Sequence, residues 1–268
     1  MRPGRSPSSS LTRIAVIGSV LALLSAASCA APGNGRSAKE LAGSRAVTFV
    51  TADGVRLAGR LFPSKAGGSS GVVLSHMLPA DQRSWFPFAE RLATEGFTAL
   101  TFDFRGYCPG GDGGCSSGTR DIASIWRDVA AAAAFLRQQG VATISLVGAS
   151  MGGTASLIAA AGPQPPAGDV AAVITLSSPL AIEGLSVTPE LLLTVQAAKL
   201  FIASLGDGEA ATSAEQLYDL ASSPKREEII AVDGHGTDLL TSNQGEEVQR
   251  LILSTLDQYM QAPAGAAG

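Results

Sequence analysis

The sequence predicts an α/β protein in which a mostly parallel sheet of eight strands is covered by helices on both faces. Short apolar runs alternate along the chain with longer segments of helical pattern. The chain is 46% apolar and only 16% charged, so its 268 residues can bury a large core. Neither an internal repeat nor a linker divides the body after residue 45, which indicates one main domain.

The elements follow from the same alternation. Residues 47–51 and 55–61 are expected to form a hairpin that turns at Asp53-Gly54, because Asp-Gly suits a tight hairpin turn. A helix is expected from Pro189, since Thr188 can cap it and proline is tolerated in the first turn. The other expected strands are residues 72–75, 98–102, 144–147, 172–176, 200–204 and 228–232. The expected helices are residues 85–95, 119–139, 152–161, 189–197, 213–221 and 245–260.

Residues 1–29 have the pattern of a signal peptide. Three arginines precede an apolar run at 14–24, which is shorter than the roughly 20 residues of a membrane-spanning helix. The end, Ala26-Ala27-Ser28-Cys29, resembles a bacterial lipobox, although Ala26 stands where that motif usually has Leu. The resemblance implies lipid attachment at Cys29 and a lipoprotein of the bacterial cell envelope. The alternative is cleavage nearby, for example after Ala30, which would give a soluble secreted protein.

The expected domain organisation continues from this signal. Residues 30–45 are expected to be a flexible tether, 46–262 the folded domain and 263–268 a disordered tail. The net charge is −4 and the body has no Lys/Arg cluster, which argues against nucleic acid as a partner. Membrane contact is therefore expected through the N-terminal lipid only.

Three cysteines fit the same compartment. With Cys29 assigned to the signal, Cys108 and Cys115 remain and flank a glycine-rich loop. A pair of cysteines in an exported protein is most simply a disulfide. A metal site is the alternative, but no histidine or third cysteine lies nearby in the sequence.

The segment Gly148-Ala149-Ser150-Met151-Gly152 carries the sharpest chemical signal. It has the form G-x-S-x-G, follows an expected strand and opens an expected helix, which is the context of a nucleophile elbow. The tight turn holds Ser150 out of the helix, and the glycines let strand and helix approach closely. Ser150 is the predicted nucleophile.

A serine nucleophile needs a base, and the chain has only two histidines. His235 follows the last expected strand, and triads built on this elbow run in the order Ser, acid, His. Asp207 follows the strand before it and is the predicted acid, which fixes the imidazole tautomer. Glu209, two residues further on, is the rival for that role.

Together, His76-Met77-Leu78-Pro79, Phe102-Asp103-Phe104-Arg105-Gly106 and the elbow resemble the α/β-hydrolase superfamily over residues 46–260. The nearest types are the compact dienelactone-hydrolase-like and serine-aminopeptidase-like esterases. Many dienelactone hydrolases use Cys as nucleophile, and Ser150 departs from that pattern.

The resemblance implies further roles. The backbone N–H groups of Met77 and Met151 would form the oxyanion hole, with His76 buttressing the loop rather than acting as base. Asp103 would brace the active-site loops as a structural residue. Superfamily members often have Gly where Met77 stands, so this side chain is expected to narrow the pocket above the oxyanion hole.

These features predict a serine hydrolase of small esters or thioesters that acts through an acyl-enzyme, without cofactor or metal. Only residues 177–198 are available for a lid, which favours a small, open site for a small-molecule acyl substrate. A peptidase or an acyltransferase with the same triad is the alternative within enzymes. A non-catalytic surface-binding lipoprotein is the alternative outside them.

Overall fold

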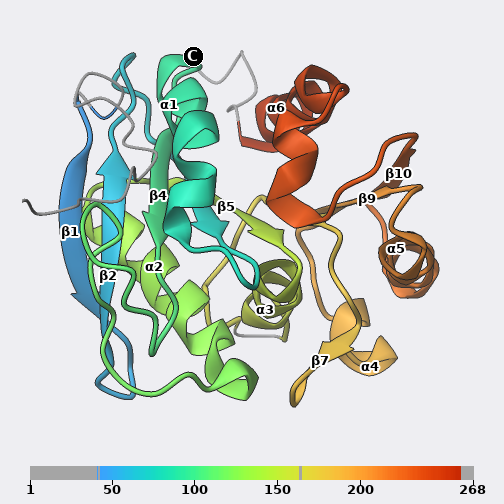
Figure 1. The fold of residues 1–268 in the computed structure, drawn as a ribbon, viewed down its shortest axis with the longest axis horizontal. Helices are drawn as coiled ribbons and strands as arrows, with labels where there is room; N and C mark the ends of the chain where they lie inside the picture. The colour runs from blue at the N-terminus through green and yellow to red at the C-terminus, as the bar shows by residue number, and fades with distance from the viewer. Residues whose placement is uncertain (1–40, 42, 163–164, 261–268) are drawn as a thin grey trace, which may run out of the picture. The chain divides into compact units, whose positions relative to one another are not determined.

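Eight strands form one sheet in the spatial order β1-β2-β4-β3-β5-β6-β9-β10 (Figure 1). This is a computed structural model that describes residues 41, 43–162 and 165–260. The strands are β1 (Arg45–Val50), β2 (Arg56–Phe62), β3 (Ser70–Ser75), β4 (Thr98–Phe102), β5 (Thr143–Ala149), β6 (Ala172–Leu176), β9 (Ala198–Ser204) and β10 (Lys225–Ile230).

The predicted α/β class with a mostly parallel sheet is confirmed. Strand β2 pairs antiparallel with β1 and with β4, and every other neighbouring pair in this sheet is parallel. The predicted hairpin is also confirmed, with Arg45 opposite Leu61 and Gly54 at φ 85° in the turn. Strands β4 and β6 are buried along their whole length, as their continuous apolar sequence requires between two helical layers.

Helices cover both faces, as predicted. On one face α1 and α6 pack in one apolar cluster, and on the other α2, α3 and α5 pack in a second. Figure 1 shows α1 running alongside β4. Neighbouring residues of β3 divide between the clusters, Val73 facing α2 and α3 while Val72 and Leu74 face α1 and α6. The helices are α1 (Phe86–Thr94), α2 (Trp126–Gln138), α3 (Met151–Ala159), α4 (Pro189–Leu193), α5 (Gly208–Leu220) and α6 (Gly245–Met260).

Some predicted boundaries were wrong for identifiable reasons. The helix expected from residue 119 begins only at Trp126, after a short 3-10 turn (Ile122–Ser124), because the backbone of Arg120 packs against Gly106. Helix α5 begins before the expected residue 213, because the Asp207 side chain accepts a hydrogen bond from the Ala210 N–H and caps it. Strand β10 begins at Lys225, earlier than the expected residue 228. The additional residues are charged, which an edge strand tolerates.

The segment between β6 and β9 contains a feature that the sequence analysis missed. Strands β7 (Ala181–Ile182) and β8 (Leu185–Ser186) form a small separate hairpin. Its turn, Glu183-Gly184, has φ values of 45° and 84°, which is the backbone that a tight hairpin turn requires. Helix α4 follows and ends at Leu193, four residues earlier than expected. The small lid therefore consists of one hairpin and one short helix.

Several expectations fall outside the described residues. These are the signal peptide at 1–29 with Cys29, the tether up to residue 40, and the tail at 263–268. Within the described part of the chain, none of the helices combines the length and apolarity that crossing a membrane requires.

Candidate active site

Ser150 lies at the turn between β5 and α3 with φ 50° and ψ −123°, a conformation that non-glycine residues rarely adopt. Its N–H donates to the Leu176 carbonyl at 2.8 Å, which fixes the turn against β6. A Cβ on Gly148 would lie 2.3 Å from the Gly152 oxygen, and one on Gly152 would lie 2.4 Å from the Ser75 oxygen. The glycine spacing therefore meets a steric requirement, and it presents Ser150 at the carboxyl edge of the sheet.

His235 and Asp207 come together although 28 residues separate them. His235 follows β10, and its Nδ1 contacts Asp207 Oδ2. The other oxygen, Asp207 Oδ1, accepts the Ala210 N–H at 3.3 Å and caps α5. The helix cap thus fixes the carboxylate that orients the imidazole.

Ser150, Asp207 and His235 line one cavity of about 270 Å³. Ser150 is 7% exposed, whereas the side chains of His235 and Asp207 are 41% and 24% exposed. The cavity is open enough for a ligand to reach the imidazole while Ser150 stays largely shielded. Its lining is completed by residues of the β6–β9 segment and of α5, namely Ser177, Pro179, Ala181, Ile182, Glu209, Ala210 and Ser213.

Glu209, the rival acid, lines this cavity but is exposed on α5. The imidazole contact is made by Asp207. Ser177, Ser213 and the β7–β8 hairpin were not identified as site residues from the sequence. No local motif marks them, because they reach the cavity only when β6 and α5 are placed beside the elbow.

The two residues expected to supply the oxyanion donors, Met77 and Met151, lie after β3 and directly after Ser150. Met151 is the first residue of α3, so its N–H has no carbonyl of its own helix to bond. Met77 follows β3, the strand next to β5. Its side chain is buried against the His235 loop, where Met77 Sδ accepts from Thr237 Oγ1 at 3.7 Å. The expectation that this side chain narrows the pocket was wrong, since Met77 packs beneath the loop and does not line the cavity.

His76 is held as a neutral, fully buried ring. Its Nδ1–H donates to the Met77 carbonyl at 2.9 Å, and its Nε2 accepts the Phe104 N–H at 3.2 Å. Burial lowers the pKa of His76 to about 4, and the ring packs between Phe104 and Tyr107. Both nitrogens are occupied within the protein, so the ring supports the loop of Met77.

Asp103 is also buried and is held mainly by Gln82, a residue that the sequence analysis did not single out. The Gln82 N–H and Nε2 donate to the two carboxylate oxygens of Asp103 at 3.0 and 2.7 Å. Burial raises the pKa of Asp103 to about 7. Gln82 also donates to the Gly113 carbonyl, inside the loop that the Cys108–Cys115 disulfide closes. Asp103 thus ties this loop to the end of β4.

Arg105 braces the same turn against two neighbouring elements. Its guanidinium bonds Asp128 of α2 at 2.6 Å and Asp53 of the β1–β2 turn at 2.9 Å. These bonds hold the pKa of Asp53 well below its usual range. The buried ion pair joins three elements behind the loop that carries His76.

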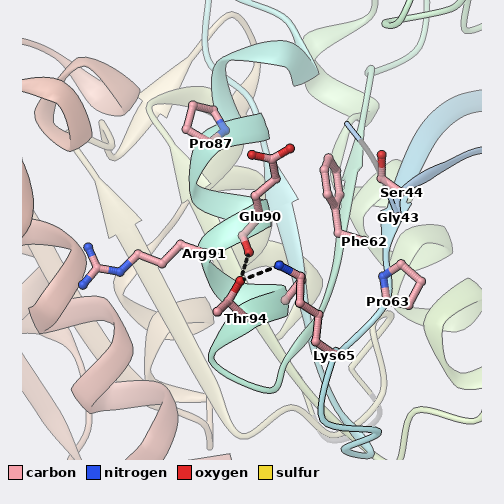
Figure 2. Close-up of a pocket in the computed structure, with 10 residues that line it drawn as sticks. Gly43, Ser44, Phe62, Pro63, Lys65, Pro87, Glu90, Arg91 and Thr94 are labelled. Atoms are coloured by element: carbon pink, nitrogen blue, oxygen red, sulfur yellow. Dashed lines mark hydrogen bonds between the residues drawn. The ribbon is translucent and has the colours of Figure 1, made fainter. Parts of the chain in front are cut away.

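A larger cavity, about 410 Å³, lies between β2 and α1 (Figure 2). In it Lys65 Nζ donates to Thr94 Oγ1 at 2.9 Å, and that hydroxyl donates to the Glu90 carbonyl at 3.0 Å. Its lining includes neither Ser150 nor His235. Cavity size alone therefore does not identify the candidate site, and the smaller cavity is chosen because Ser150, His235 and Asp207 line it together. In the described residues no three His, Cys, Asp or Glu side chains are grouped as a metal site.

A strand–elbow–helix unit with an aspartate-bound histidine, at the carboxyl edge of a mostly parallel sheet, defines the class of protein. The alpha/beta hydrolase family model matches residues 67–264. The chain belongs to that family, and the resemblance inferred from the sequence is confirmed at this level. No curated protein matches the sequence.

Solved structures share the fold at low sequence identity. An esterase of Pyrococcus furiosus matches with a TM-score of 0.70 and 17% identity, over 85% of this chain and 96% of that one. A dienelactone hydrolase of Anabaena variabilis matches with a TM-score of 0.64 and 22% identity, over 81% and 97%. The esterase domain of a Rhodothermus marinus protein matches with a TM-score of 0.62 and 22% identity, over 81% and 99%.

Proposed function

We propose that this protein is an exported serine esterase that cleaves small ester or thioester substrates through an acyl-enzyme on Ser150. The observation that carries the proposal is the convergence of Ser150, His235 and Asp207 on one cavity. Esterases and a dienelactone hydrolase among the structural neighbours favour esters as the substrate class.

The proposed reaction has two steps. Ser150 Oγ attacks the acyl carbon while His235 Nε2 takes its proton, and the same nitrogen then protonates the leaving group. Water, deprotonated by His235, attacks the acyl-enzyme and releases the acid. Asp207 keeps the Nδ1–H tautomer in place and stabilises the imidazolium. The N–H groups of Met77 and Met151 would stabilise the oxyanion, each donor contributing about 3 kcal/mol.

The small size of the lid supports a preference for short acyl groups. The segment beside Ser150 offers only the β7–β8 hairpin and α4 to cover a substrate. Each buried CH₂ contributes about 0.8 kcal/mol, so kcat/KM should stop rising with chain length once the cavity is full. We expect a maximum below octanoate in a series of p-nitrophenyl acetate, butyrate, octanoate and palmitate. A maximum at octanoate or beyond would contradict the short-acyl preference without affecting the triad.

A fluorophosphonate probe tests the proposed function directly. The wild-type protein should be labelled and should hydrolyse p-nitrophenyl butyrate. The Ser150→Ala variant should show neither labelling nor hydrolysis while keeping the wild-type melting temperature. The same preparation is given thioester and peptide substrates and an acyl acceptor, which separates the esterase from a peptidase or an acyltransferase. A folded wild-type protein that is not labelled would favour a binding protein instead.

A further inference from the structure

The Ser177 hydroxyl is a buried polar group that has no hydrogen-bond partner among the described residues. Ser177 is fully buried, and its Oγ makes no hydrogen bond within the described part of the structure. Buried hydroxyls are normally hydrogen-bonded, because leaving one unpaired forfeits its bonds to water. Ser177 also lines the cavity of Ser150 and His235. A group on a ligand in that cavity could supply the missing hydrogen bond.

The backbone at Ser177 supports a role in the site. Its φ is 52°, and only Ser150 and Glu183 share a positive φ among the non-glycine residues that the structure describes. Such conformations are costly and gather at functional sites. The strain is maintained by the sheet, since the Ser177 N–H donates to the Ile202 carbonyl of β9 at 2.7 Å. The hydroxyl is therefore held in place one strand away from the nucleophile.

The neighbouring Ser178 provides an internal contrast. It too is buried, 2% exposed, and its Oγ has no partner in the described residues. However, Ser178 is absent from the cavity lining, and its Oγ lies 1.9 Å from where a Cβ on Gly153 would stand. Its hydroxyl thus packs against α3. Two adjacent serines with the same chemistry thus differ in which one belongs to the cavity lining.

We infer that Ser177 is a specificity-determining residue that hydrogen-bonds a hydroxyl group of the substrate close to the scissile ester bond. This inference rests on the proposed esterase function and narrows its substrate class to hydroxylated small esters. A hydroxyl group both donates and accepts, so it can satisfy Ser177 Oγ in either direction. The other lining residues from the β6–β9 segment, Pro179, Ala181 and Ile182, are apolar, so Ser177 is the polar side chain that this segment adds to the lining. The polar residues Glu209 and Ser213 line the cavity from α5.

The substrate hydroxyl could belong to the acyl group or to the alcohol, and two isosteric pairs distinguish these sources. The acyl pair is p-nitrophenyl 3-hydroxybutyrate, each enantiomer separately, against p-nitrophenyl 3-methylbutyrate. The alcohol pair is 2-hydroxyethyl butyrate against propyl butyrate. In one of the pairs the wild type should prefer the hydroxylated ester by about tenfold in kcat/KM, the effect of one satisfied hydrogen bond.

Three variants decide the assignment. Ser177→Ala and Ser177→Gly should both lose the preference, and the glycine variant tolerates a φ of 52° if alanine destabilises the turn. Ser178→Ala, the matched control, should keep the preference. The inference is overturned if the wild type shows no preference in either pair, if both Ser177 variants retain it, or if they slow all of these esters equally. Fluorophosphonate labelling and hydrolysis of p-nitrophenyl butyrate report separately on the proposed esterase function.

Discussion

The carboxylate of Asp207 has two partners, and each of its oxygens contacts one of them. Oδ1 caps α5 through the Ala210 N–H, and Oδ2 contacts the His235 ring. A substitution can therefore affect helix stability, imidazole orientation or both. Asparagine caps a helix about as well as aspartate but carries no charge, so it separates the two effects.

We predict that Asp207→Asn lowers kcat/KM by roughly 10⁴-fold with little change in stability, because the imidazole loses the charge that fixes its tautomer. Asp207→Ala should lose the same activity and about 1 kcal/mol of folding free energy as well, since the cap is also removed. Ester hydrolysis and thermal unfolding measure the two effects. Glu215→Gln, an exposed charge change on the same helix, is the control. A larger loss for Glu209→Gln than for Asp207→Asn would make Glu209 the acid.

Two buried groups near the site have pKa values that are shifted in opposite directions. The pKa of Asp103 is raised from 3.8 to about 7, so the folded state keeps a proton that the unfolded state loses, and stability falls as pH rises from about 4 to 7. The pKa of His76 is lowered from 6.5 to about 4, so the unfolded state takes up a proton that the folded state excludes. The contribution of His76 is therefore lost as pH falls from 6.5 to 4. Over that window the two slopes offset each other.

Asp103→Asn should remove the contribution of Asp103 to the pH dependence of stability and leave the contribution of His76. We predict that its free energy of unfolding falls more steeply than that of the wild type between pH 6.5 and pH 4, measured by denaturant titration at several pH values. Asp112→Asn, an exposed aspartate in the same disulfide loop, should keep the wild-type slope. Equal slopes for Asp103→Asn and the wild type would show that Asp103 does not titrate in this range.

At the scale of the elements, the close contact between β5, α3 and β3 determines where Ser150 points. A Cβ on Gly152 would meet the Ser75 and His76 carbonyl oxygens at 2.4 and 2.6 Å, and backbone atoms cannot rotate away. In contrast, a Cβ on Gly208, at the start of α5, would meet nothing within 4 Å. Both positions are glycines, but only Gly152 lies where a side chain would clash with the backbone.

We predict that Gly152→Ala destabilises the protein by about 1–3 kcal/mol, because the added methyl group overpacks the crossing of α3 and β3. Gly208→Ala should be neutral or should stabilise it by up to about 1 kcal/mol, since alanine restricts the unfolded chain. Chemical denaturation of both variants beside the wild type is the measurement. A tolerated Gly152→Ala would mean that the helix can move away from β3.

At the scale of the whole molecule, the proposed export involves two features of the chain, the disulfide of the folded domain and the N-terminal segment. A disulfide between Cys108 and Cys115 is the bond expected in an oxidising compartment. The N-terminal segment proposed to direct export, with Cys29 as the lipid-bearing residue, lies outside the described structure. The fold and the proposed localisation thus concern separate parts of the chain and need separate tests.

We predict that Cys29→Ala, expressed in a bacterium with a lipoprotein pathway, moves the protein from the membrane fraction to the soluble exported fraction. The reason is that the lipid is the proposed membrane contact of the chain. Immunoblotting of fractionated cells measures the shift. Alkylation without reduction should show the Cys108–Cys115 disulfide in both forms, so that a change in fractionation is not mistaken for misfolding. Membrane retention of Cys29→Ala would refute lipid anchoring at this residue.

The fold class, the elbow and the three residues that line the candidate site together could be predicted from the sequence. Apolar alternation and the glycines around Ser150 are local signals, because periodicity and close backbone approach leave a mark on neighbouring residues. With two histidines in the chain, the choice of His235 was narrow.

The remaining features of the site could be seen only once the chain was folded. The tertiary structure placed Met77 beneath the His235 loop instead of over the pocket, and it joined Gln82 to Asp103. It also brought Ser177 to the cavity and added a hairpin beside it. These features depend on contacts between residues far apart in the chain, and the direction of a side chain across such a contact has no local sequence signature.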